Sequence, residues 1–109
     1  MPFDPFLAEQ MRDALKTRRG VQEKAMFGGR CWLLHGNMLC AVEVGRFMFR
    51  VGKDLEAQAL AKPGVEVVSF PPRRMGGFVW VDADACLDAG LDTWIDFTVR
   101  YVGALPPKG

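Results

Sequence analysis

The stretch Met26-Phe27-Gly28-Gly29-Arg30-Cys31-Trp32 decides how this chain folds. It joins the end of one strand-like segment to the start of the next through two adjacent glycines. Glycine reaches backbone conformations with positive φ at little cost, so a glycine pair permits a sharp reversal of the chain. A phosphate-binding loop would need a helix start and a Lys-Ser/Thr pair after the glycines, and neither follows. The stretch therefore predicts a tight turn or bulge between two strands.

Short strands are predicted on both sides of this turn. One strand precedes it and three follow it, at residues 21–26, 30–35, 38–43 and 46–51. Gly36-Asn37 has the composition of a two-residue hairpin turn. If both later turns are two residues long, residue 35 pairs with residue 38 and residue 43 pairs with residue 46. These strands then form an antiparallel meander.

Helices are predicted at the two ends of the chain. Asp4-Pro5 has the pattern of an N-cap followed by proline at the first helical position, which indicates a helix over residues 4–17. A last helix is expected over residues 91–102. Between them we expect a short helix, a strand, a loop, a second strand and a turn or short helix opened by Asp82 or Asp84, with the first four at residues 54–61, 65–70, 71–77 and 78–81. Clustered strands flanked by helices indicate an α+β fold with an antiparallel sheet.

The predicted pairing divides the meander's side chains between two faces. The almost wholly apolar face is expected to be the core: Cys31, Leu33, Met38, Cys40, Val42, Phe47, Phe49 and Val51. The other face is mixed, and its candidate interaction residues are Trp32, Leu34, Leu39, Arg46, Met48 and Arg50. An exposed apolar patch with Trp and Arg is typical of an interaction surface. The alternative is that a terminal helix covers this face and makes it a second core.

Length and composition describe one domain, residues 1–109, with a formal net charge of +1. A dedicated nucleic-acid-binding domain usually carries a clear basic excess, so the charge weighs against one. No apolar run is long enough to cross a membrane, and the start of the chain is unlike a secretory signal. We therefore expect a cytoplasmic protein. Its three cysteines have no metal-ligand spacing, which favours buried thiols over a metal site.

No group of residues has the pattern of a catalytic site, a metal site or a cofactor site. His35, the only histidine, lies four residues from Cys31 on a predicted strand, roughly 13 Å away, so the two cannot form a catalytic pair. Asp82, Asp84 and Asp88 lack the glycine and terminal glutamate of a calcium loop. We expect no catalytic residues, no metal and no cofactor.

Arg73 and Arg74 form a candidate anion site in the predicted loop. With aromatic residues on either side, the two arginines could bind an anion or stack on a nucleic-acid base. The alternative is an ordinary solvated loop, which the neutral overall charge favours.

Several segments together resemble a known family. Lys24-Ala25-Met26-Phe27-Gly28-Gly29, followed by the Gly36-Asn37 hairpin, is similar to the N-terminal domain of the TfoX/Sxy competence regulators, with Met26, Phe27, Gly28 and Gly29 as the signature turn. Further similar segments lie at residues 47–52 and 74–81, at Trp94 and at residues 101–108. The resemblance covers nearly the whole chain. It implies helices on a curved antiparallel sheet, related to type III secretion chaperones, and it brings no established catalytic residues.

The resemblance also implies a functional class. The larger family members regulate DNA-uptake genes, are thought to work with the cyclic-AMP receptor protein and carry a second, C-terminal domain. We expect a stand-alone N-terminal domain acting as a non-enzymatic interaction or regulatory module, with a protein partner or a second copy of itself. Two alternatives remain: a DNA-associated regulator with Arg18, Arg19, Arg73 and Arg74 as phosphate contacts, and a small-molecule binder or enzyme.

Overall fold

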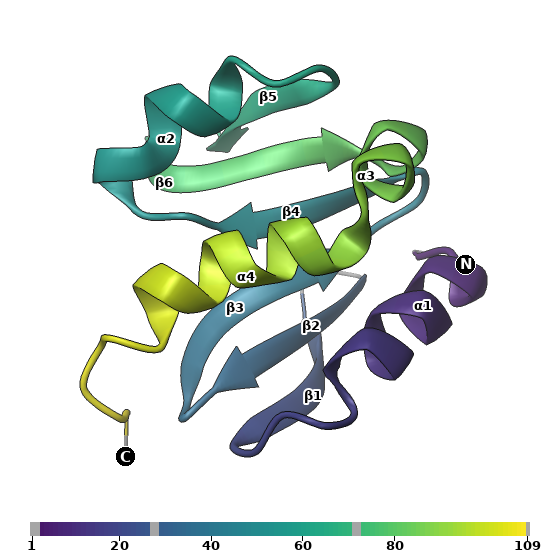
Figure 1. Ribbon diagram of the computed structural model, residues 1–109, viewed down its shortest axis with the longest axis vertical. Coiled ribbons are helices and arrows are strands. Elements are labelled where there is room, and N and C mark those ends of the chain that lie inside the picture. Colours follow the sequence, from purple (N-terminus) through teal and green to yellow (C-terminus); the bar gives the residue numbers. More distant parts are fainter. Residues whose placement is uncertain (1–2, 27–28, 71–72, 109) are drawn as a thin grey trace.

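A computed structural model of the protein describes residues 3–26, 29–70 and 73–108 (Figure 1). Within these residues the chain forms four helices and six strands. In chain order they are α1 (Pro5–Leu15), β1 (Val21–Met26), β2 (Gly29–Leu34), β3 (Asn37–Val42), β4 (Arg46–Arg50), α2 (Lys53–Leu60), β5 (Val65–Phe70), β6 (Arg73–Asp82), α3 (Ala83–Ala89) and α4 (Leu91–Val102).

The described strands form one antiparallel sheet in the order β1-β2-β3-β4-β6-β5. The first four strands are a meander, as predicted. After β4 the chain passes through α2 to the edge strand β5, and β6 then returns between β5 and β4 (Figure 1). The predicted α+β fold with an antiparallel sheet is confirmed.

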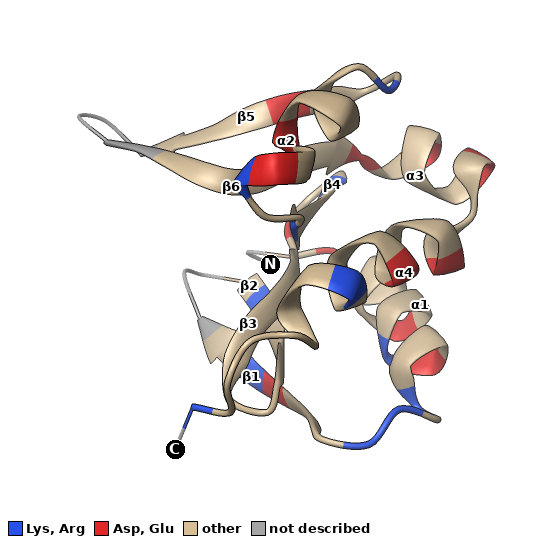
Figure 2. Ribbon diagram, turned by 60° about the vertical axis from the view of Figure 1, so that its left-hand side comes forward, with Lys and Arg blue, Asp and Glu red and all other residues tan. Residues whose placement is uncertain are grey.

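The helices pack on one face of this sheet. Figure 2 shows α1, α3 and α4 together on one side of the strands, and the main core contains apolar residues from every described helix. At its centre the Trp94 ring of α4 stacks on Phe49 of β4, with ring centroids 5.4 Å apart. Leu7, Met11 and Leu15 supply the apolar side of α1. This side of the sheet is therefore the folding core.

The helix ends agree with the sequence in two places and differ in a third. The Asp4 carboxylate accepts a hydrogen bond from the Phe6 backbone N–H at 2.9 Å, and the Asp82 carboxylate caps α3 by accepting from Ala85 N–H. The α2 helix begins at Lys53, one residue before the predicted Asp54, with Gly52 as its N-cap and no side-chain cap. The helix start at residues 52–53 therefore lacks the side-chain oxygen that usually satisfies its first N–H groups.

The predicted loop over residues 71–77 is wrong for residues 73–77, which belong to β6. The strand starts at Arg73, and its first residues pair with the end of β5 through Phe70↔Arg73 and Ser69↔Arg74. Proline and glycine in this segment indicated a loop, but pairing with β5 outweighs that local preference. The strand β6 is thus ten residues long. Residues 78–82 pair with β4, and the earlier residues extend beyond the end of that pairing.

The predicted hairpin turn is also displaced by one residue. Leu34 pairs with Asn37, so the turn residues are His35 and Gly36 instead of Gly36 and Asn37. Both have positive φ, 52° and 84°, as a type I′ hairpin turn requires. A bulge follows: Leu33 pairs with Met38 and Trp32 with Cys40, which leaves Leu39 as the extra residue.

Candidate functional site

The predicted interaction face does not form a single surface. Trp32, Leu34 and Leu39 lie in the helix-covered core with exposed fractions of 2%, 6% and 0%. The cause is the pairing of β2. The predicted pairing puts Trp32 opposite Ala41, but Trp32 pairs with Cys40, and this one-residue shift places Trp32 on the core face. The extra residue Leu39 reverses the alternation of faces toward the turn, so Leu39 lies on the core side, as does Leu34, which pairs with Asn37. The alternative that helices cover these residues is the one observed.

Met48, Arg46 and Arg50 lie on the other face of the sheet. There Met48 forms a second apolar cluster with Val68 and Trp80, and four partly buried residues pack against it: Met38, Ala41, Met75 and Phe78. We call these seven residues the helix-free cluster, because none of its described members comes from a helix. Ala41, Met48 and Trp80 follow one another across β3, β4 and β6 in the strand pairing. The sequence pattern missed the members on β5 and β6, because it assigned pairing and faces only to the strands of the meander and took Met75 to lie in a loop.

Two arginines on this face lie against aromatic rings. The Arg46 guanidinium carbon lies 3.7 Å from the centre of the Trp80 ring, and its Nε donates to Glu43 Oε1 at 2.9 Å. The Arg50 guanidinium carbon lies 5.4 Å from the ring centre of Phe78 and 5.6 Å from that of Tyr101. Cation–π contacts of this kind hold a long side chain in place. The face thus presents methionine, aromatic and guanidinium groups, which are enriched in protein interfaces.

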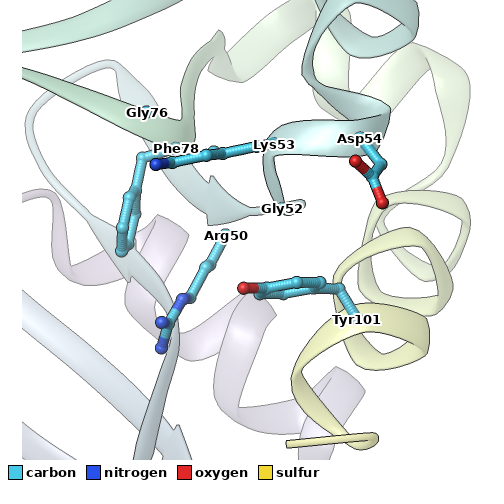
Figure 3. A pocket seen from close by; sticks show the side chains of 8 residues that line it. Arg50, Gly52, Lys53, Asp54, Gly76, Phe78 and Tyr101 are labelled. Atoms are coloured by element: carbon cyan, nitrogen blue, oxygen red, sulfur yellow. The ribbon is translucent and has the colours of Figure 1, made fainter.

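A cavity of about 290 Å³ adjoins this face where β4 leads into α2. Its lining comes from four elements and the β4–α2 junction: Arg50, Gly52, Lys53, Asp54, Gly76, Gly77, Phe78 and Tyr101. Figure 3 shows the Arg50 side chain below the cavity, the Lys53 side chain above it and the Tyr101 hydroxyl pointing toward the Arg50 side chain. We call this the cationic pocket. Its lining residues come from three separate segments, at residues 50–54, 76–78 and 101, so no local motif could reveal it.

Glycines let the two chain segments of the pocket approach each other. The Gly77 carbonyl accepts from the N–H groups of both Val51 and Gly52, at 2.8 and 3.0 Å. The Gly77 N–H donates to Glu56 Oε1 at 3.2 Å, and Glu56 is buried. Gly77 has a φ of +86°, and a Cβ there would lie 3.2 Å from the Gly52 backbone. The β4–α2 junction is therefore fastened to β6 through backbone atoms.

The charged groups of the pocket are arranged unevenly. Among the described residues, neither Arg50 nor Lys53 forms an ion pair. The one carboxylate in the lining belongs to Asp54, and in Figure 3 it points away from the Arg50 guanidinium and the Lys53 ammonium. The two cationic groups therefore face the cavity from opposite sides without a described counter-charge between them.

The other candidate residues are dispersed. Phe27 and Gly28 of the signature turn lie outside the described residues, while Met26 and Gly29 form the last pair between β1 and β2. The side chains of Arg73 and Arg74 also lie outside the described part of the structure. Arg18, proposed as a phosphate contact, pairs instead with Asp96 at 2.9 Å. The candidate anion site at Arg73 and Arg74 therefore stays a prediction.

The three cysteines are buried thiols, as the sequence predicts. The Cys40 Sγ lies 3.6 Å from Met11 Sδ, and burial raises the pKa of the Cys40 thiol. Burial also raises the pKa of the Cys86 thiol to about 12. Thiols in these surroundings stay protonated near neutral pH and are poor nucleophiles. Within the described residues no three His, Cys, Asp or Glu side chains are grouped to hold a metal ion, and no helix there is long and apolar enough to span a membrane.

Comparison with known proteins identifies the family. The family model described as the TfoX N-terminal domain matches residues 13–101. No curated protein and no solved structure gives a significant match. The matched region runs from the last turn of α1 to the last turn of α4 and so includes the whole described sheet. The chain therefore belongs to the TfoX N-terminal domain family.

Proposed function

We propose that this chain is a non-enzymatic protein-interaction module with a regulatory role of the TfoX type. The observation that carries the proposal is the helix-free cluster. Its partly buried members Met38, Met75 and Phe78 pack against Met48, Val68 and Trp80 on a face to which no described helix contributes. Trp, Met and Arg are enriched where proteins bind each other, and this face carries all three.

The partner is another protein or a second copy of this chain. Methionine side chains adapt to different partner surfaces because they are unbranched and polarisable. Arg46 and Arg50 border the apolar residues and would orient a partner through charge. Because Met48 and Trp80 are buried, the partly buried members of the cluster and the two arginines would make the contacts with a partner. This differs from the surface expected from the sequence, which centred on Trp32.

The test is affinity capture from the lysate of the source cell with three forms of the tagged protein. Met38→Glu places a charge on the helix-free cluster. Phe6→Glu is the matched control, because Phe6 is 57% exposed on α1, on the opposite side of the sheet. We expect the same proteins to be retained by the unmodified chain and Phe6→Glu, and to be lost with Met38→Glu. Circular dichroism must show that all three are folded.

Two further readouts separate the alternatives. Light scattering at tens of micromolar tests self-association: a dimer lost only in Met38→Glu identifies a second copy as the partner. Nuclease treatment of the lysate tests the DNA-associated alternative, which predicts that retained material disappears with the nucleic acid. The proposal fails if Met38→Glu and Phe6→Glu retain the same proteins and have the same mass in solution.

A further inference from the structure

The cationic pocket has the chemistry of an oxyanion site, and this inference goes beyond the proposed function because it concerns a small ligand. We propose that the pocket binds the phosphate group of a small molecule through Arg50, Lys53 and the start of α2. The cavity of about 290 Å³ is close to the lower end of the range of about 300–1,000 Å³ for small-ligand sites. A small molecule with one phosphate group and few other atoms fits a cavity of this size.

Arg50 is held in a way that keeps its hydrogen-bonding edge available. The Phe78 and Tyr101 rings lie 5.4 and 5.6 Å from its guanidinium carbon. Contact with aromatic rings leaves the in-plane N–H donors of a guanidinium for other partners. None of the described hydrogen bonds or ion pairs uses the Arg50 side chain. A fixed guanidinium with free donors is suited to bidentate contact with two phosphate oxygens.

Lys53 supplies a second positive charge from a different element. It is the first residue of α2, and Figure 3 shows its side chain on the opposite side of the cavity from Arg50. Gly76 allows it to lie along β6, since the Lys53 Cε is 3.3 Å from where a Gly76 Cβ would be. Two cations that face one cavity from opposite sides repel each other, and an anion between them offsets this repulsion because it attracts both.

The start of α2 adds to the positive electrostatic potential in the cavity. Gly52 is the N-cap, with no side-chain cap hydrogen bond, and Gly52, Lys53 and Asp54 all line the cavity. The N–H groups of the first residues of a helix favour an anion. The Asp54 carboxylate opposes this, but it points away from the two cations (Figure 3). The Tyr101 hydroxyl, directed toward the Arg50 side chain, offers one further donor.

The test is a titration of the full 15N-labelled chain with inorganic phosphate at constant ionic strength, followed by amide chemical shifts. We expect saturable shifts at residues 52, 53, 76 and 77. Ribose 5-phosphate in place of phosphate distinguishes the source of the group, because a phosphate ester is expected to bind more tightly than free phosphate. Acetate, which has one negative charge and a planar shape, is expected to bind at least tenfold more weakly than phosphate.

Three variants make the test specific. Lys53→Gln is expected to weaken phosphate binding by roughly tenfold, and Arg50→Lys by a similar factor because lysine lacks the planar fork. Lys16→Gln is the matched control: it also removes one lysine charge, at a surface depression on α1 where Lys16 pairs with Asp13. Equal weakening in Lys53→Gln and Lys16→Gln would overturn the proposal, since only net charge would then matter. Shifts that do not saturate, or acetate binding as tightly as phosphate, would overturn it too.

Discussion

Gly52 joins β4 to α2 in a backbone conformation that disfavours every residue with a side chain. Its φ is +85°, and a Cβ there would lie 2.4 Å from Cδ1 of Tyr101. We predict that Gly52→Ala lowers the free energy of unfolding by about 2–3 kcal/mol, from backbone strain together with the overlap. Urea unfolding measures this loss.

Gly45→Ala is the control, because Gly45 also has positive φ but a Cβ there would meet nothing within 4 Å. This variant should therefore lose only about 1 kcal/mol of unfolding free energy. Equal losses in the two variants would contradict a specific contact with Tyr101.

Thr98 is a buried polar residue in the middle of an apolar helix face. Its hydroxyl donates to the carbonyls of Leu39, at 3.1 Å, and Arg50. Leu39 is the bulged residue of β3, so the hydroxyl ties α4 to the irregular part of the sheet. Thr98→Val keeps the shape and removes the donor, and we expect a loss of about 1–2 kcal/mol in urea unfolding.

The control for this variant is Thr93→Val on the same helix. Thr93 is exposed, and its hydroxyl donates to the Ala89 carbonyl at 3.3 Å. A solvent-exposed hydroxyl is readily replaced by water, so the change should stay within about 0.5 kcal/mol. A Thr98→Val protein as stable as the Thr93→Val protein would show that Thr98 contributes packing alone.

At the scale of elements, the sequence predicts the type and order of most helices and strands. Hydrophobic spacing identified α1 and α4, and the strands β1 to β5 lie within one or two residues of their predicted ends. The pairing of β2 with β3 was not predictable in the same way. A turn at His35–Gly36 and one at Gly36–Asn37 both have suitable composition, and the bulge at Leu39 has no local signal. That one irregularity decided which face Trp32 occupies.

The contact between α1 and β1 is electrostatic and therefore depends on pH. Arg12 donates to both carboxylate oxygens of Glu23 at 2.8 Å, and Arg30 lies 3.1 Å from the same carboxylate. The hydrogen bond from Arg12 lowers the pKa of Glu23 below its ordinary value of 4.5. A lowered pKa in the folded protein means that the stabilisation is present above pH 4.5 and is lost as the pH falls through the lowered value.

We predict that Glu23→Gln costs up to about 1 kcal/mol at pH 7, since the Arg12 side chain is half exposed. The difference from the unmodified chain should shrink below pH 4.5 and vanish once Glu23 is protonated. Urea unfolding from pH 7 to pH 2.5 measures it. A difference that stays constant over this range would mean that the ion pair does not contribute.

At the scale of the whole molecule, the candidate sites depend on contacts that no segment of sequence contains. The sequence named Arg50, but it placed this residue on a surface with Trp32 instead of in a pocket with Lys53 and Tyr101. The pocket forms because β6 inserts between β4 and β5 and brings Gly76 and Gly77 against the start of α2. Residue types alone indicate which groups could bind an anion, while the crossover topology determines which of them meet.

The burial of all three thiols makes their reactivity a measure of opening of the whole molecule. Cys31 on β2, Cys40 on β3 and Cys86 on α3 have exposed fractions of 0%, 1% and 0%. Burial raises the pKa of each thiol, to about 12 for Cys86, so few thiolates exist at pH 8. We predict that a disulfide reagent modifies the native protein only at the rate at which the fold opens, and modifies three thiols at once in urea.

Leu87→Cys is the control, because residue 87 is exposed beside Cys86 on α3, and its thiol should react at the rate of an unfolded peptide. Rapid modification of one native thiol in the unmodified chain would mean that its element opens separately from the rest of the core.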